Sequence, residues 1–148
     1  MMSESKAAIL RLMNEYCYRV DGGDFEGFAS LFEHGSFHVL GDPAGALVGA
    51  EAVRGLLANV TLYDGKPRTK HVLTNVQIDI DYSGMNAAAQ SYITVFQALP
   101  PDFPLQAIFI GHYYDTFENT GDGWRFKTRE ISPDLIGDLS RHRADMAG

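Results

Sequence analysis

The hydrophobic residues of this chain change their spacing once along the sequence, and that change limits the folds available to it. In the N-terminal part they recur at helical spacing, in a stripe made of Ile9, Leu12, Met13, Tyr16 and Val20. Between Lys70 and Ile131 they alternate instead, along segments long enough for strands and separated by turns. Helices followed by antiparallel strands predict an α+β fold, in which the helices pack on one face of a curved sheet.

Turn-forming residues divide the chain into the expected elements. We expect a first helix that ends at Gly22-Gly23, a short helix after Asp24, a short strand that begins at Ser36, and a third helix over residues 49–60. Long strands are predicted over residues 70–82, 87–99, 105–118 and 124–131, and a polar tail follows Pro133.

Composition excludes several classes of function. The chain has 148 residues, which suits a single domain over residues 1–148, and 12 basic against 19 acidic residues give a net charge of −7. A negative surface repels nucleic acid, and the longest apolar runs are shorter than the roughly 20 residues that span a membrane. Cys17 is the single cysteine, so no internal disulfide is possible; we expect a cytoplasmic protein in which this thiol is buried and inert.

Asp21 has an unusual position for an acidic residue. It lies at the C-terminal end of the first predicted helix, where the helix dipole disfavours negative charge. One interpretation is a hydrogen bond to the backbone of Gly22-Gly23. The other is a partner on the sheet, and His71 is the candidate, because a carboxylate that holds one ring nitrogen prepares the other to act as a base. Taken alone, His71 is equally consistent with an ordinary strand histidine.

The strand that carries His71 has two different sides. Its alternation predicts Val72, Val76, Ile78 and Ile80 on one side, with His71 on the other, more polar side.

The order of the elements and four segments together resemble a known family. These segments are Tyr18-Arg19-Val20-Asp21, Gly49 to Leu57, Lys70-His71-Val72-Leu73-Thr74-Asn75, and the hairpin from Gly111-His112-Tyr113-Tyr114-Asp115 to Gly123-Trp124-Arg125-Phe126 and Arg129. They are similar to the SnoaL-like branch of the NTF2-like superfamily. The resemblance implies a cone-shaped α+β fold and covers nearly the whole chain.

Two enzymes of that branch, scytalone dehydratase and hexachlorocyclohexane dehydrochlorinase, pair an Asp at the end of the first helix with a His on a mid-chain strand. The matching positions are Asp21 and His71. The chain departs from both enzymes: Tyr16 stands where the dehydrochlorinase has Lys, and Val20 stands where scytalone dehydratase has Tyr. The second catalytic His of scytalone dehydratase has no counterpart on the expected next strand.

We therefore expect a lyase of the dehydratase type, without cofactor, that acts on a small hydrophobic, cyclic or aromatic substrate with His71 and Asp21 as catalytic residues. Alternatives are an enzyme like ketosteroid isomerase or polyketide cyclase, and a non-catalytic partner module like the small subunit of ring-hydroxylating dioxygenases. Candidate substrate-binding residues are Tyr16, Phe32, Tyr92, His112 and Arg129, although a surface position is expected for Arg129 and core packing for Phe32.

Metal binding is not expected. His34 and His38 straddle a predicted helix end, and no cysteine or carboxylate stands at metal-ligand spacing. An exposed sheet face favours association, so a homodimer or homotrimer is expected.

Overall fold

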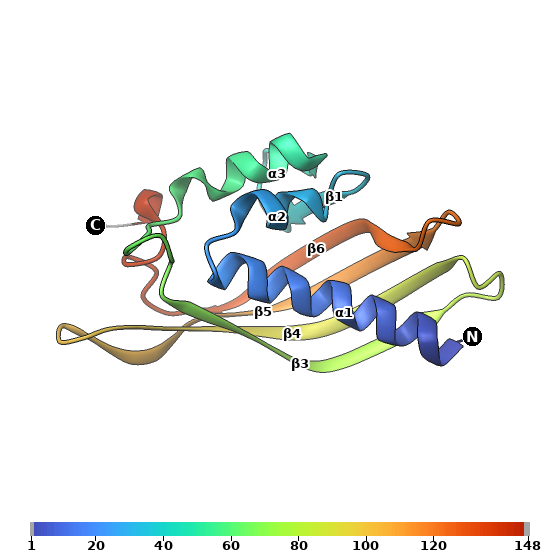
Figure 1. Cartoon of the computed structure of the whole chain (residues 1–148). Helices are drawn as coiled ribbons and strands as arrows, with labels where there is room; N and C mark the ends of the chain where they lie inside the picture. The colour runs from blue at the N-terminus through green and yellow to red at the C-terminus, as the bar shows by residue number, and fades with distance from the viewer. Residues whose placement is uncertain (1, 147–148) are drawn as a thin grey trace.

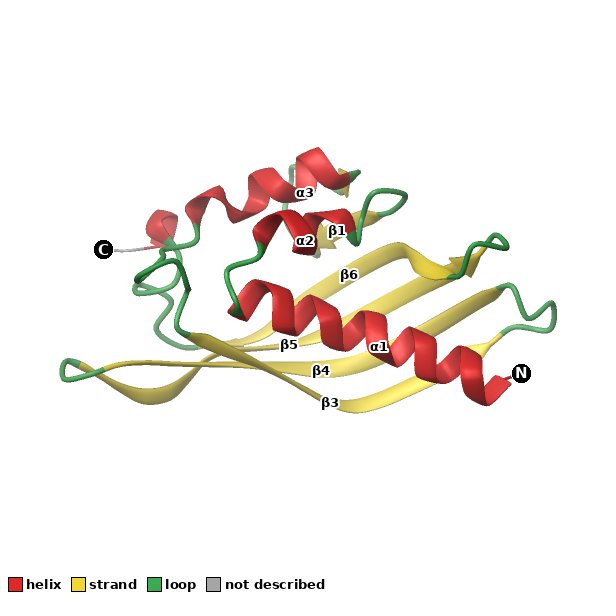
Figure 2. Cartoon of the chain, in the orientation of Figure 1, coloured by secondary structure: helices red, strands yellow, loops and turns green. Residues whose placement is uncertain are grey.

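The structure, a computed structural model that describes residues 2–146, places its helices on one face of a curled sheet (Figures 1 and 2). The helices are α1 (Met2–Asp21), α2 (Phe25–Ser30) and α3 (Ala50–Leu56), with short 3-10 turns at Leu57–Asn59 and Ala144–Met146. The predicted apolar stripe of α1 faces the core: Ile9, Met13, Tyr16 and Val20 are buried, and Leu12 is partly buried. No helix in this part of the chain is long and apolar enough to cross a membrane.

The sheet has six strands in the order β2-β1-β6-β5-β4-β3. These strands are β1 (Ser36–Val39), β2 (Leu47–Val48), β3 (Thr69–Ile80), β4 (Asn86–Leu99), β5 (Phe103–Asn119) and β6 (Trp124–Ile136). β1 runs parallel to β6, and every other pair of neighbours is antiparallel. The predicted class is confirmed: helices pack on a mixed, mainly antiparallel sheet.

β3 does not keep one alternation along its length. Asn75 has a φ of 56°, in the left-handed region, and the pairing with β4 shifts register between Thr74 and Gln77. A bulge of this kind exchanges the two sides of a strand. The prediction that Val72 shares a side with Val76 is therefore wrong: Val72 is 40% exposed, whereas His71 before the bulge and Val76 after it are partly buried.

The C-terminal part is more ordered than the predicted polar tail. β6 continues through Pro133 to Ile136, and Pro133 lies opposite Gly111 beside a register shift, where the missing N–H of proline is tolerated. The following segment turns back across the sheet. Thr61 N–H donates to the carbonyl oxygen of His142 at 2.9 Å, and the Gln97 side chain donates to that of Arg141 at 3.2 Å.

Aromatic side chains fill the space between the helices and the sheet. The rings of Tyr16 and Phe28 are 4.4 Å apart between centroids, and those of Phe32 and Phe126 are 5.0 Å apart. Phe32 is fully buried, as expected for a core residue. The abundance of aromatic residues in the sequence is thus largely explained by this core.

Candidate functional site

Asp21 is the last residue of α1, and the chain turns sharply after it. The backbone N–H groups of Gly22 and Gly23 donate to the carbonyl oxygens of Tyr18 and Val20. Gly23 has a φ of 79°, and a Cβ there would collide with the carbonyl oxygen of Gly65. Because backbone carbonyls satisfy both glycine N–H groups, the interpretation of Asp21 as a cap for this turn is wrong.

The carboxylate of Asp21 instead binds the start of β3 with both of its oxygens. Its Oδ1 lies 2.6 Å from His71 Nδ1 and accepts a hydrogen bond from the Thr69 hydroxyl at 2.8 Å. Its Oδ2 accepts the backbone N–H of His71 at 2.7 Å. The side chains of Asp21 and His71 are only 11% and 10% exposed. Three contacts to one strand fix the carboxylate and leave Nε2 of His71 as the unengaged ring nitrogen.

The charge of Asp21 is maintained in this partly buried place. Burial raises the pKa of the carboxyl group, but the hydrogen bonds and charge of His71, with the Thr69 hydroxyl, outweigh it and hold the pKa below its usual value. Asp21 is therefore ionised near neutral pH. An ionised carboxylate on Nδ1 keeps the proton of a neutral His71 there and stabilises the imidazolium form.

His142 is a neighbour of this pair that the sequence did not reveal. The centroids of its ring and of the His71 ring are 6.5 Å apart. Burial, together with the nearby His71 and Arg143, lowers the pKa of His142 to about 4. It lies in a segment predicted to be a polar tail, without any alternation that would place it on a face of the sheet.

A buried ion pair lies deeper in the fold. Arg129 donates from Nε and Nη2 to the two carboxylate oxygens of Asp115, each at 2.8 Å, and both side chains are 0% exposed. Burial disfavours the positive charge of Arg129, but the attraction and hydrogen bonds of Asp115 outweigh burial and raise the pKa of Arg129 above its usual value. The expected surface position of Arg129 is therefore wrong.

Tyr16 connects the two charged pairs. Its ring lies 6.5 Å from that of His71 between centroids, and the Arg129 guanidinium carbon lies 4.3 Å from its centroid. The same guanidinium lies 3.6 Å from the ring centroid of Tyr113. The interior thus holds an Asp–His pair and an Asp–Arg pair with an aromatic residue between them.

Comparison with known proteins agrees with this architecture. The sequence model of the SnoaL-like domain matches residues 1–130. The protein belongs to the SnoaL-like family. A search of curated proteins finds no match.

Solved structures resemble this SnoaL-like protein over most of its length. An NTF2-like protein with a cystatin-like fold from Novosphingobium aromaticivorans is 23% identical, with a TM-score of 0.74 over 89% of this chain and 83% of the other. A candidate scytalone dehydratase from the same organism is 26% identical, with a TM-score of 0.71 over 90% of this chain and 86% of the other. A candidate dehydratase of the NTF2-like family from Streptomyces avermitilis is 20% identical, with a TM-score of 0.69 over 90% of this chain and 99% of the other. These likenesses establish the cone-shaped NTF2-like fold.

Two of the candidate substrate-binding residues of this SnoaL-like protein lie away from the interior. Tyr92 and His112 are on the outer face of the sheet, where their rings are 5.0 Å apart between centroids and that of Tyr114 stacks on His112 at 4.2 Å. His112 Nε2 also lies 3.0 Å from the side-chain oxygen of Gln90. Tyr16 lies between His71 and Arg129 in the interior. Tyr92 and His112 lie apart from these three residues, on the other face of the sheet.

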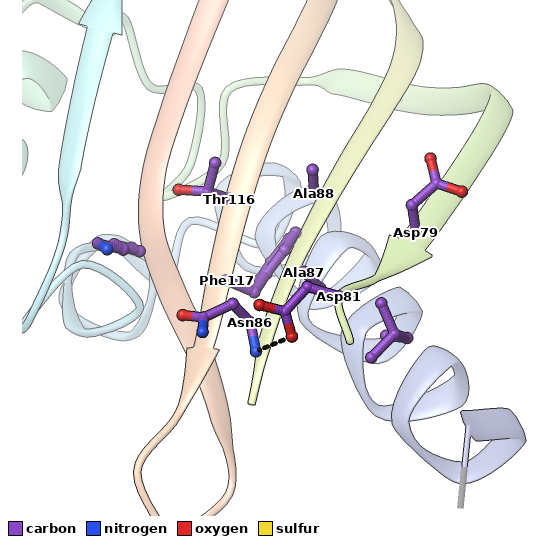
Figure 3. Close-up of a pocket in the computed structure, with 9 residues that line it drawn as sticks. Asp79, Asp81, Asn86, Ala87, Ala88, Thr116 and Phe117 are labelled. Atoms are coloured by element: carbon purple, nitrogen blue, oxygen red, sulfur yellow. Dashed lines mark hydrogen bonds between the residues drawn. The ribbon is translucent and has the colours of Figure 1, made fainter. Parts of the chain in front are cut away.

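Two of the surface pockets among the described residues lie away from the pair, because neither is lined by Asp21 or His71. One, of about 450 Å³, lies at the far end of β3 between Asp79, Asp81, Asn86 and their neighbours (Figure 3). The other, of about 680 Å³, lies between α1 and β3 beside Lys6, Leu10 and Gln77. Within residues 2–146, no group of three His, Cys, Asp or Glu side chains is placed to hold a metal ion.

Cys17 lacks the surroundings that make a thiol nucleophilic. It is buried on α1, and its thiol lies 3.6 Å from the carbonyl oxygen of Met13. Burial raises the pKa of the thiol to about 11, so the reactive thiolate is scarce at neutral pH.

Proposed function

We propose that this SnoaL-like protein is a cofactor-independent lyase that eliminates water from a small cyclic or aromatic substrate. The observation that carries the proposal is the 2.6 Å contact between Asp21 Oδ1 and His71 Nδ1. It fixes an imidazole against a carboxylate, the arrangement in which a histidine side chain can act as a general base. Asp21 holds this base in one tautomer and compensates the charge that it acquires.

The reaction balances with these two residues. His71 Nε2 removes a proton from the carbon next to the one that bears the hydroxyl group, and the electron pair of that C–H bond becomes the new C=C bond. The C–O bond breaks, and the departing oxygen takes the proton from the imidazolium and leaves as water. His71 returns to its neutral form, while Asp21 keeps its charge throughout.

The comparisons support this proposal by analogy. The solved structure described as a candidate scytalone dehydratase is 26% identical to this chain. Asp21 and His71 also occupy the positions at which the resemblance to dehydratases and dehydrochlorinases places the catalytic pair. An isomerase or a polyketide cyclase could use the same pair, because both reactions begin with proton removal from carbon.

A screen of cyclic and benzylic alcohols tests the proposal. The purified protein is incubated with each alcohol, and mass spectrometry follows the loss of water while ultraviolet absorbance follows the new conjugated double bond. We expect turnover by the wild type and a loss of at least ~100-fold in His71→Ala. His38→Ala is the control, because this partly exposed histidine lies beside Glu130 and away from Asp21. Rearranged products of unchanged mass would replace the lyase by an isomerase, and equal rates in wild type and His71→Ala would refute the role of His71.

A non-catalytic partner module is the second candidate. It is favoured by the packing of the interior, where Phe28, Phe32 and Tyr113 are at most 2% exposed, and by pockets that lie away from His71. The exposed rings of Tyr92 and Tyr114 on the outer face would then contact another chain. Absence of turnover across the screen, combined with a stable complex through this face, would favour the module.

A further inference from the structure

The C-terminal segment covers the Asp21–His71 pair. Residues 137–146 follow β6 and form what we call the C-terminal strap, which rises from the sheet toward the loop after α3 (Figure 1). Two rings lie against that of His71, namely Tyr16 of α1 and His142 of the strap, each 6.5 Å away between centroids. The side chain of His71 is only 10% exposed. A substrate that is to reach it must therefore displace part of this cover.

The two parts of the cover differ in how firmly they are held. Tyr16 is 5% exposed and packs on Phe28 and Tyr113, so this part of α1 cannot shift without opening the core. The strap is irregular apart from a 3-10 turn at Ala144–Met146 and an isolated bridge, and it contributes Leu139 to the edge of the core. Segments with few buried apolar contacts open locally at lower cost than helices and strands. The strap is therefore the movable part.

Hydrogen bonds to strap carbonyl groups hold it down. The carbonyl oxygen of Arg141 accepts the Tyr63 hydroxyl at 2.5 Å and the Gln97 side-chain amide at 3.2 Å. That of His142 accepts the backbone N–H of Thr61 at 2.9 Å. All three donors lie outside the strap. These bonds are therefore exchanged for bonds to water when the strap lifts, so each adds only a modest net stabilisation.

The closed strap leaves two buried polar atoms without partners. Oε1 of Gln97 and Nδ1 of His142 are buried and form no hydrogen bond among the described residues. Burying a polar atom without a partner costs free energy, and contact with water removes that cost. Opening of the strap thus breaks the bonds that hold it but restores the hydration of these two atoms. This restored hydration lowers the free energy of opening.

We propose that the C-terminal strap is a lid that must open for a substrate to reach His71. The inference rests on the function proposed above, because it concerns access to the same base. The lid pivots after Gly137, whose N–H donates to the carbonyl oxygen of Ile108 on β5 at 2.9 Å. In its closed position it shields the Asp21–His71 pair from solvent, as lids of enzyme sites do.

A disulfide across the edge of the strap tests the lid. Val60 and Arg143 are antiparallel partners, and the bond from Thr61 N–H to the His142 carbonyl makes them a pair without mutual hydrogen bonds. The Cα atoms of such pairs are about 4.5 Å apart, within the range that a disulfide bridges. In the double variant Val60→Cys/Arg143→Cys, oxidation locks the strap beside His142 and reduction releases it. The same chain is thus its own control.

Labelling with diethyl pyrocarbonate, which acylates accessible imidazoles, measures how often His71 is exposed. Peptide mass spectrometry gives the rate at each histidine and verifies the disulfide. We expect His71 and His142 to be labelled at least ~10-fold more slowly in the oxidised than in the reduced variant. His38, which is partly exposed beside Glu130, should keep one rate. Equal rates at His71 in the two states, or no labelling of His71 in the reduced variant, would overturn the lid.

A single substitution tests the opposite direction without a disulfide. Tyr63→Phe removes the hydroxyl that donates to Arg141 and keeps the ring, so we expect His71 to be labelled about threefold faster or more. Tyr82→Phe is the matched control, because Tyr82 is exposed between β3 and β4. An unchanged rate at His71 in Tyr63→Phe would overturn the lid in the form proposed.

The labelling needs no substrate, so its outcome separates the lid from the proposed reaction. Labelling that depends on the lock, without turnover of any alcohol, would retain the lid and overturn the lyase. Labelling that ignores the lock, with turnover of an alcohol by the wild type, would overturn the lid and retain the lyase. If both proposals hold, oxidation of the double variant should suppress turnover and reduction should restore it.

Discussion

Acid should destabilise this protein through His142. Burial, the nearby His71 and Arg143 lower the pKa of this imidazole from 6.5 to about 4 in the folded state. The unfolded chain, in which the pKa is ordinary, therefore binds a proton on His142 at a pH where the folded protein does not. The stability that His142 contributes by staying neutral is fully present above about pH 6.5, and it is lost as the pH falls toward 4.

The two pKa values set the size of the effect. Linkage gives a decrease in the free energy of unfolding of about 2 kcal/mol between pH 7.5 and pH 5, and ~3 kcal/mol once the pH reaches 4. The effect of Asp21 is separable by pH: its pKa is lowered, so the stability it provides is lost only below the usual range of a carboxyl group. The window between pH 7 and pH 5 therefore reports on histidine.

Urea unfolding followed by the fluorescence of Trp124 provides the assay, at half-unit steps from pH 7.5 to pH 5. We expect the wild type to lose about 2 kcal/mol and His142→Gln to lose much less over the same range. His38→Gln, which changes a partly exposed histidine near Glu130, should follow the wild type. If His142→Gln and the wild type show the same dependence on pH, then His142 is not held neutral by its surroundings.

Four further outcomes follow from other parts of the structure. Arg129→Met should lower the free energy of unfolding by about 3–5 kcal/mol, because it leaves the buried charge of Asp115 unpaired; urea unfolding measures it. Gly23→Ala should lower the free energy of unfolding by more than ~1 kcal/mol, because residue 23 has a φ of 79°, which alanine rarely adopts. Gly55→Ala should not lower it, because a Cβ at that position has open space, and thermal unfolding measures both variants. Asp21→Asn should reduce turnover of any substrate found by at least ~100-fold with the fold intact by circular dichroism. Light scattering should give two or three times the 16.3 kDa of one chain, and a monomer at micromolar concentration would contradict the expected association.

The order of the elements could be predicted because each depends on signals within its own segment. The stripe of α1 repeats at helical spacing, Gly22-Gly23 ends the helix, and Asp24 caps α2 by accepting the backbone N–H of Gly27 at 2.9 Å. These are local effects of side-chain spacing and backbone freedom. They do not depend on how distant segments meet, so one sequence suffices to find them.

The faces of the strands were harder to predict, because bulges reset the alternation. The left-handed Asn75 exchanges the sides of β3, and a similar shift between Val95 and Phe96 of β4 changes the register with β5. Asparagine tolerates such a backbone, but many asparagines in strands do not form bulges. The alternation alone therefore put Val72 on the same side as Val76, although Val72 is exposed and Val76 is partly buried.

The pairing of the buried ion pair also depends on a bulge. Beside the turn, Asn119 is paired with Trp124, and this register continued without interruption would put Asp115 opposite Thr128. The register shift between Thr116 and Phe117 brings Asp115 opposite Arg129. The burial of the pair depends in addition on Tyr16 and Tyr113, which enclose the guanidinium.

His142 differs from the Asp21–His71 pair in what determines its place. Asp21 is located by the end of a helix and His71 by the start of a strand, so both can be expected from local patterns. The segment of His142 has no pattern of its own, and it is held by hydrogen bonds from Thr61 and Gln97, which are distant in the sequence. The Asp21–His71 pair can therefore be expected from the sequence, but the position of His142 beside it requires the folded chain.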